Sequence, residues 1–366
     1  MAFCGEWQSH GRMAENTGRT DARWRVLVGH GDAEGTLLAF DYDSQTGNLT
    51  PAGETATGSS TSYLAVHPGG RVLYLTHNRS NQLAAWRIAD SGALELVGRV
   101  DVPAAPGEAA AGPAYVTVHP GGSWLLAANY RGHNAVVFAL DGQGRPGQLA
   151  SSVTGGKHAH AIRLSPNHAF AFVPYLGSDH VGQYRLDPHT GALIANEPPT
   201  ARTSPGAGPR HLEFHPRFPI VYVLGELDAH LYMYLLDAAG ILEPRGHLHT
   251  LPDDYEGRRW AAHLQADHTG RFLYVSNRAH DSLAVFAIDG DPEAPLLVER
   301  QPSGGQTPRH FSLSPDGRFL LVANQDSGNL VRFAVDPITG RLTRLGELPV
   351  GASPYFVNFV ALPPAT

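Results

Sequence analysis

The stretch Val66-His67-Pro68-Gly69-Gly70 recurs almost unchanged as Val118-His119-Pro120-Gly121-Gly122. Weaker copies of this turn follow along the chain, with their turn positions at residues 166, 216, 268 and 315. Neighbouring turn positions are about 46 to 52 residues apart, so the chain repeats one structural unit. A period of this length is typical of repeat folds, in which adjacent units share a continuous core.

Each unit contains four short stretches with the composition of β-strands. In the second copy, apolar strands are expected at residues 114–118, 124–129 and 134–140, and a weaker fourth strand completes the unit. The sequence contains 41 glycines and 28 prolines, which supply the turns between these strands. Long amphipathic helical patterns are nearly absent. Four strands in about 50 residues are the pattern of one propeller blade.

The two ends of the chain complete the count of blades. Six full units run from about residue 58 to 349, while residues 24–50 contain only the later strands of a unit. Residues 351–362 resemble the missing first strand, and their pairing would remove the exposed edges of an open ring. The sequence therefore predicts an all-β fold: one seven-bladed β-propeller of four-stranded antiparallel blades, closed by the C-terminal strand joining the N-terminal blade. Residues 23–366 are expected to form this single domain.

Composition narrows the class of protein. The 366 residues carry a net charge of −7 and include no run of 18 apolar residues. This balance disfavours nucleic acid or a membrane surface as a partner, and no membrane-spanning helix is expected. The single cysteine, Cys4, excludes an intramolecular disulfide and a cysteine-based zinc site. Residues 1–22 are polar and are expected to be a flexible tail without a secretory signal. We expect the protein to be cytoplasmic and to be a monomer or a weak homodimer.

Two positions in every unit are expected to meet at one mouth of the central channel. The innermost strand begins, and its antiparallel neighbour ends, at the same face of the ring. The first position, six and five residues before the turn, holds Ser62-Tyr63, Ala114-Tyr115, His160-Ala161, Arg210-His211, Ala262-His263, Arg309-His310 and, in the closing strand, Tyr355-Phe356. The second, about ten residues after the turn, holds Asn78, Tyr130, Leu176, Glu226, Arg278 and Gln325.

Arginines, histidines and one glutamate thus gather in the later units, which predicts a cationic pocket in an acidic protein. Arginine presents a planar fork of donors that matches carboxylate and phosphate groups, so a small anionic ligand is expected. Glu226 could be a counter-ion, or a general acid or base tuned by its charged neighbours. The turn histidines His67, His119 and His215 are expected at the opposite face in structural roles.

Other chemistries find less support in the sequence. Lys157-His158-Ala159-His160 contains a His-x-His pair, which would place two imidazoles on one side of a strand, as in some metal sites. No carboxylate of known position accompanies the pair, so no metal is predicted. The sequence also contains no G-x-S-x-G elbow, P-loop or H-E-x-x-H motif.

The chain resembles the lactonase family of seven-bladed propellers, which includes bacterial 6-phosphogluconolactonases and fungal carboxy-cis,cis-muconate cyclases. The resemblance covers about residues 24–362. It rests on Lys157–Ala161, Gly208–Pro216, Gly225–Leu227, Leu273–Ser282, Pro308–Phe311 and Val322–Ser327. One departure from the family pattern is the segment Pro174–Asp179, because the corresponding strand in such proteins more often ends in an Asp-Leu-Gly-like sequence. The resemblance implies that the catalytic residues are His160, Arg210, Glu226 and Arg278, which the positions around the channel had already singled out.

The resulting hypothesis is hydrolysis of a sugar lactone, 6-phosphoglucono-1,5-lactone, to 6-phosphogluconate in the pentose phosphate pathway. Glu226 or His160 would take a proton from water, and no metal or other cofactor would be needed because arginine can stabilise an oxyanion. Substrate contacts are expected from His158, His211, His263, Arg309, His310 and Gln325. Two alternatives are a cycloisomerase acting on a carboxymuconate or muconolactone, and a non-catalytic protein-binding propeller.

Overall fold

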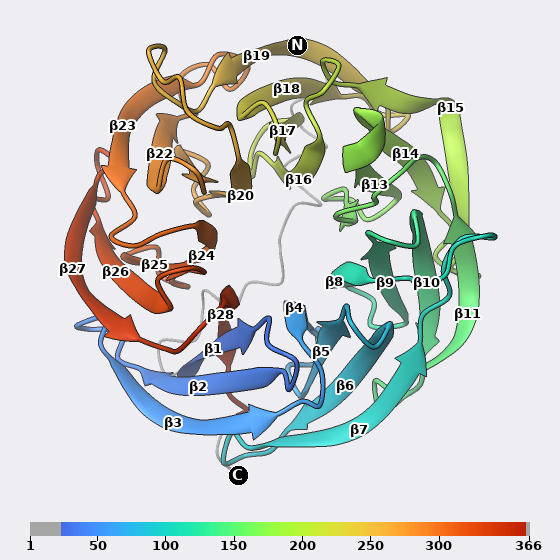
Figure 1. Cartoon of the computed structure of the whole chain (residues 1–366). Helices are drawn as coiled ribbons and strands as arrows, with labels where there is room; N and C mark the ends of the chain where they lie inside the picture. The colour runs from blue at the N-terminus through green and yellow to red at the C-terminus, as the bar shows by residue number, and fades with distance from the viewer. Residues whose placement is uncertain (1–22, 364–366) are drawn as a thin grey trace.

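The computed structural model describes residues 23–363 as a ring of seven antiparallel sheets around a central axis (Figure 1). The innermost strands are β4 (Thr61–Val66), β8 (Pro113–Val118), β12 (Arg163–Leu164), β16 (Pro209–Phe214), β20 (Ala261–Ala266), β24 (Pro308–Leu313) and β28 (Pro354–Ala361). Their neighbours are β5 (Val72–His77), β9 (Trp124–Asn129), β13 (Phe170–Tyr175), β17 (Ile220–Gly225), β21 (Phe272–Asn277), β25 (Phe319–Asn324) and β1 (Trp24–His30).

The third strands are β6 (Gln82–Ile88), β10 (Asn134–Leu140), β14 (His180–Leu186), β18 (His230–Leu236), β22 (Ser282–Ala287), β26 (Asn329–Val335) and β2 (Thr36–Tyr42). The outermost are β7 (Leu94–Asp101), β11 (Pro146–Val153), β15 (Leu193–Arg202), β19 (Leu242–His249), β23 (Leu296–Pro302), β27 (Leu342–Pro349) and β3 (Leu49–Ala56). A short 3-10 helix, η1 (Leu176–Ser178), follows β13. The expected propeller of four-stranded blades is confirmed.

The ring closes through the two ends of the described chain. β28 pairs with β1 in a sheet of order β28-β1-β2-β3, with Arg25 opposite Val360 and Val28 opposite Val357. The predicted closure is therefore confirmed. The tail expected over residues 1–22 lies outside the described residues. Within residues 23–363, no helix is long and apolar enough to cross a membrane, and the cytoplasmic location stays a prediction.

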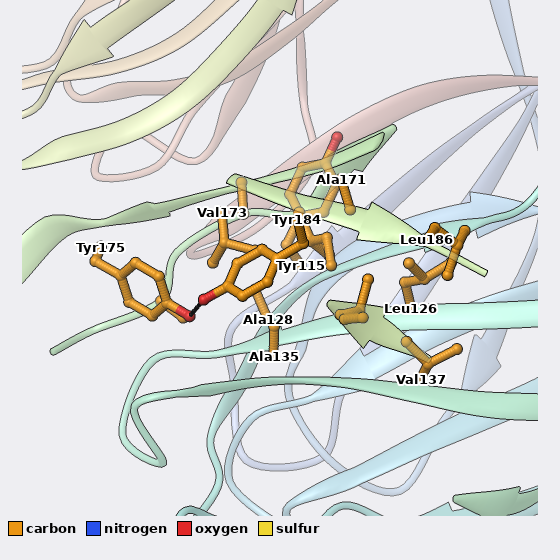
Figure 2. Close-up of a cluster of buried hydrophobic side chains, with 14 residues drawn as sticks. Tyr115, Leu126, Ala128, Ala135, Val137, Ala171, Val173, Tyr175, Tyr184 and Leu186 are labelled. Atoms are coloured by element: carbon orange, nitrogen blue, oxygen red, sulfur yellow. Dashed lines mark hydrogen bonds between the residues drawn. The ribbon is translucent and has the colours of Figure 1, made fainter. Parts of the chain in front are cut away.

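The core lies between neighbouring blades, where the two faces of each sheet are covered. One such layer joins β9 and β10 to β13 and β14, and contains Leu126, Val137 and Val173, all fully buried (Figure 2). Tyr175 and Tyr184 lie in the same layer, with their hydroxyl oxygens 2.9 Å apart. Buried tyrosines need a partner for the hydroxyl group, and this pair provides one without breaking the apolar layer.

The turn histidines have structural roles, as the sequence predicts. In the first repeated turn, His67 Nδ1 accepts the backbone N–H of Gly69 at 3.0 Å, while Nε2 lies 3.1 Å from the carbonyl oxygen of Gly122. The first contact shapes the turn and the second joins it to the next blade. His215 repeats this arrangement, with Nδ1 accepting from the Arg217 N–H at 3.0 Å and Nε2 facing the carbonyl of Ile288 at 3.3 Å.

A β-bulge recurs at the start of the inner strands. On β16, Pro209 pairs with Gly225 and His211 with Leu224, so Arg210 is an extra residue. Arg309 on β24 and Tyr355 on β28 occupy the same extra position. A bulge breaks the alternation of side chains, which allows two consecutive residues to face the channel. The pattern explains why pairs such as Arg210 and His211 lie against each other.

Candidate active site at the channel mouth

Arg210, Glu226 and Arg278 meet at the face where the inner strands begin. Arg210 comes from the bulge of β16, Glu226 directly follows β17, and Arg278 directly follows β21. One carboxylate oxygen of Glu226, Oε2, lies 2.9 Å from Arg210 Nε and 3.0 Å from an Arg278 NH2 group. The arginine side chains are only 4% and 2% exposed, against 14% for the carboxylate. The structure thus brings together three residues that the sequence positions predicted to converge.

Trp260 completes the surroundings of Glu226, and the sequence analysis missed it. Its indole Nε1–H donates to Glu226 Oε1 at 3.0 Å, and the Arg278 guanidinium carbon lies 3.7 Å from the centre of the ring. The backbone also joins two of these residues, because the Arg278 N–H donates to the Trp260 carbonyl at 2.7 Å. Trp260 ends the long connection between β19 and β20, which has no strand register to identify it.

The charges of the three central groups are set by burial and by one another. Burial alone would raise the pKa of Glu226, but the charges of Arg278 and Arg210 and the hydrogen bonds from Trp260 and Arg278 leave that pKa below its ordinary value. Burial lowers the pKa of Arg278 to about 10, against the opposing effect of Glu226. The pKa of Arg210 is also lowered, first by burial and then by Arg278. At neutral pH, Glu226 is therefore a carboxylate and Arg278 a cation.

Both arginines are also fixed by main-chain acceptors. Arg278 donates through Nε and NH2 to the carbonyl oxygen of Ala261, at 3.2 and 2.7 Å. Arg210 donates through NH1 to the carbonyl of Ala262. These bonds hold the two guanidinium groups in place without adding a negative charge. Such preorganised donors can stabilise an oxyanion that develops during a reaction, since little reorganisation is needed.

His160 lies near the three arginines and is buried. Burial, with Arg210, Arg309 and Arg278 adding to it, lowers the pKa of His160 well below 6.5, so the imidazole is neutral. Its Nδ1 is buried and has no hydrogen-bond partner among the described residues. A neutral imidazole with a free nitrogen can receive a proton only weakly, because the arginines oppose the imidazolium form.

The prediction that His158 and His160 lie on one side of a strand is wrong. The inner strand β12 contains only Arg163 and Leu164, and His158 has a left-handed backbone with φ of 58°. Left-handed backbone at a non-glycine residue interrupts a strand. The His158 ring stacks on Tyr130 at 4.5 Å between centroids and places Nδ1 3.0 Å from the Tyr130 carbonyl oxygen. Among residues 23–363, no group of three or more His, Cys, Asp or Glu side chains is placed to hold a metal ion.

A buried aromatic cluster next to Arg210 contains His211, His263 and His310. His211 and His263 approach with Nδ1 atoms 3.0 Å apart, and the rings of His263 and His310 stack at 4.0 Å. Burial lowers the pKa of His310 to about 3, and the pKa values of the other two are also well below 6.5. These imidazoles are neutral, and whether they touch a substrate stays a prediction.

Arg309 and Gln325 form a second wall of the mouth. Arg309 NH1 donates to Gln325 Oε1 at 3.3 Å, and its guanidinium carbon lies 4.3 Å from the centre of the Tyr355 ring. All three side chains are partly exposed. They are therefore placed where a molecule entering the mouth can reach them, and substrate contact by Arg309 and Gln325 stays a prediction.

Comparison with known proteins agrees with this architecture. Residues 25–359 match the family described as "Lactonase, 7-bladed beta-propeller". The 6-phosphogluconolactonase of Pectobacterium carotovorum is 31% identical over 317 residues, covering 86% of this chain and 93% of the relative. The corresponding protein of Pectobacterium atrosepticum is 30% identical with the same coverage.

A solved structure extends the likeness to three dimensions. The periplasmic gluconolactonase of Pseudomonas aeruginosa superposes with a TM-score of 0.85 and 30% sequence identity, covering 93% of this chain and all of the other. The chain therefore belongs to the lactonase family of seven-bladed β-propellers.

Proposed function

We propose that the protein hydrolyses a sugar lactone, 6-phosphoglucono-1,5-lactone, to 6-phosphogluconate at the mouth that contains Glu226. The observation that carries the proposal is the Glu226 carboxylate between two buried arginines, in a chain whose curated relatives at about 30% identity are named 6-phosphogluconolactonase. In the reaction, a water oxygen bonds to the lactone carbonyl carbon and the ring C–O bond breaks. The proton lost by water ends on the released ring oxygen.

Arg210 and Arg278 would stabilise the negative charge that develops on the carbonyl oxygen. Their main-chain bonds fix both guanidinium groups before the substrate arrives. Removing one such donor from an oxyanion site typically costs about 10²–10³ in kcat. Arg278 is the better placed of the two to remain charged in any state of the site, because it also stacks on Trp260.

Glu226 and His160 share the proton transfer in this proposal. A substrate oxygen that contacts Arg210 or Arg278 weakens the hold of that arginine on Glu226. The pKa of Glu226 then rises from its lowered value, so the carboxylate becomes a better base when substrate is bound. His160 offers the buried free nitrogen Nδ1 as a weaker second acceptor, because burial and the nearby arginines oppose its protonated form. Groups this close to common charges titrate as a coupled set.

The experiment is a coupled assay of 6-phosphoglucono-1,5-lactone hydrolysis, corrected for spontaneous ring opening. We expect the Glu226→Gln variant to lose about 10²–10⁴ in kcat, the usual contribution of a general acid or base. Arg278→Ala should lose a comparable part of its activity. Glu243→Gln serves as the matched control, because Glu243 is an exposed residue of β19 paired only with Arg245 among the described residues.

The outcome separates the proposal from its alternatives. Full activity in Glu226→Gln would exclude the proposed chemistry at this mouth. If the wild type opens no sugar lactone above background but turns over a carboxymuconate, the cycloisomerase alternative replaces the proposal. If neither compound reacts, the protein-binding propeller is favoured instead.

A further inference from the structure

Arg309 differs from the other two arginines of the mouth in the charge of its partners. Arg210 and Arg278 share the carboxylate of Glu226. Within residues 23–363, the side-chain contacts of Arg309 are a hydrogen bond to the Gln325 amide and stacking on Tyr355, and both partners are neutral. A guanidinium held by neutral groups keeps its full charge for an incoming anion, since no carboxylate must first be displaced.

The Gln325 amide is oriented so that its oxygen faces Arg309. Its Nε2–H group donates to Asp326 Oδ1 at 3.0 Å, which leaves Oε1 for Arg309. The other oxygen of Asp326 accepts the Thr307 hydroxyl at 2.5 Å. Asp326 thus accepts from two neutral donors and makes no ion pair with Arg309. This chain of contacts positions the guanidinium and separates it from the carboxylate.

The Tyr355 ring is held from its side by the backbone of Gly31. A Cβ atom at Gly31 would lie 2.1 Å from Tyr355 Cζ, so any side chain there would collide with the ring. The Gly31 N–H also donates to the carbonyl of Ser353 at 3.0 Å, which joins the loop after β1 to the start of β28. Arg309 therefore stacks on a ring that is packed closely against the Gly31 backbone. This packing limits movement of the ring and helps to orient the guanidinium donors.

Arg309 also contributes to the field of the whole mouth. Its charge helps to lower the pKa values of His160, Arg210 and Arg278, after larger effects that begin with burial. Three guanidinium groups thus act on the region that contains the carboxylate of Glu226. The three guanidinium groups carry more positive charge than the Glu226 carboxylate can neutralise, and Arg309 is the one of the three that has no carboxylate contact among the described residues.

We propose that Arg309, positioned by Gln325 and Tyr355, is the subsite for the phosphate group of a phosphorylated sugar lactone. The inference rests on the proposed function and adds a division of roles: Arg210 and Arg278 act at the carbonyl, and Arg309 recognises the far end of the substrate. The subsite then distinguishes phosphorylated from unphosphorylated lactones. A carboxylate could bind a guanidinium by the same chemistry, so the test separates these two groups.

The first test compares two substrates in the Arg309→Gln variant. We expect kcat/KM for 6-phosphoglucono-1,5-lactone to fall by about 10- to 100-fold, mainly through KM, because a charged hydrogen-bond donor is lost. The value for unphosphorylated glucono-1,5-lactone should change by less than about threefold. Arg131→Gln is the matched control, since Arg131 is an exposed arginine at the same face that donates to the Asn78 carbonyl.

A second variant keeps Arg309 but gives it a negative neighbour. Gln325→Glu preserves the shape of the side chain and places a carboxylate beside the guanidinium. We expect the same selective loss as in Arg309→Gln, whereas Arg309→Lys should retain part of the preference for the phosphorylated lactone. Thermal unfolding of each variant shows whether it is folded. Equal losses on both substrates, or no loss on either, would overturn the subsite.

Binding without turnover distinguishes failure of the subsite from failure of the proposed function. Calorimetric titration with glucose 6-phosphate presents a phosphate alone, and titration with gluconate presents a carboxylate alone. We expect Arg309→Gln to weaken glucose 6-phosphate by at least tenfold and to leave gluconate unchanged. If gluconate is the ligand affected, Arg309 is a carboxylate subsite and the inference is wrong. If the wild type hydrolyses no lactone but this binding pattern is found, only the proposed reaction fails.

Discussion

Glu226 is the residue whose chemical state is most closely controlled by its neighbours. Two arginines contact Oε2, and the Trp260 indole donates to Oε1 at 3.0 Å. Every one of these donors favours the ionised carboxylate over the protonated acid. The indole is the only neutral member of the set among the described contacts, so replacing it changes the hydrogen bonding without changing the charge.

Trp260→Phe should therefore shift the acid limb of the pH–rate profile. Phenylalanine keeps an aromatic ring for Arg278 but removes the N–H donor, so the lowered pKa of Glu226 moves upward. We expect the acid limb of kcat/KM to move to higher pH by up to about one unit, with a several-fold loss of kcat at neutral pH.

Trp124→Phe is the control for this shift. The Trp124 indole also donates to an oxygen, the Pro188 carbonyl at 2.9 Å, but outside the mouth. It should leave the profile unchanged. An unmoved acid limb in Trp260→Phe, with kcat reduced all the same, would show that the indole only packs against Arg278.

The sequence could locate most of the central residues because strand register fixes them. Arg210, Glu226 and Arg278 follow from counting backward and forward from each turn, since paired strands place those positions at one face. Trp260 could not be found in this way, because the connection between β19 and β20 has no register. The contacts of Arg309 could not be predicted from the sequence either. Its two partners come from different blades of the ring, one on β28 and the other directly after β25.

At the scale of elements, the bulges at the starts of the inner strands determine what reaches the channel. Arg210, Arg309 and Tyr355 are extra residues in their strands. Strict alternation would have turned one member of each pair away from the axis. The sequence repeat predicts the strands. It does not predict the bulges, because a single extra residue hardly changes the composition of a strand. The shortness of β12 was missed for a similar reason, because His158 adopts a left-handed backbone that its residue type does not reveal.

The closing strand β28 is expected to contribute strongly to stability through Phe356. This side chain is fully buried among Leu27, Leu64 and Leu75, and it contacts the backbone of Gly29 so closely that a Cβ there would lie 2.0 Å from its ring. We expect Phe356→Ala to lower the free energy of unfolding by about 3–5 kcal/mol, measured by urea denaturation.

Leu345→Ala provides the comparison for this prediction. Leu345 lies on the outermost strand β27 and is 43% exposed, so its loss should cost about 0.5 kcal/mol or less. A similar small effect for Phe356→Ala would mean that the closing blade is not part of the cooperative unit.

At the scale of the whole molecule, buried neutral histidines should make the protein sensitive to acid. The pKa of His310 is lowered to about 3, and those of His77 and His215 to about 4, in each case chiefly by burial. In the unfolded chain these groups take up protons near pH 6.5. The unfolded state thus binds more protons below that pH, so stability present above pH 6.5 is lost as the pH falls toward the folded pKa values.

We expect the urea midpoint to fall steeply between pH 6.5 and 4. Each such histidine should lower the free energy of unfolding by about 1.4 kcal/mol per pH unit in this range. His310→Gln should make this dependence shallower by one such contribution, whatever its effect on stability at neutral pH. The exposed His189 is the control, and His189→Gln should leave the slope unchanged. A slope that His310→Gln does not alter would contradict the neutral state assigned to this imidazole.

Ring closure by β28 also has a consequence while the protein is being made on the ribosome, because β1 cannot pair with β28 until β28 has been synthesised. Arg25 is made 335 residues before Val360, with which it pairs in the ring. At elongation rates of about 5–20 residues per second, roughly 20–70 s pass between them. Throughout that interval the apolar strand β1 lacks its inner neighbour, although Val26 and Val28 are fully buried in the finished ring. The nascent chain must keep this edge from pairing with other chains until β28 has been made and can pair with β1.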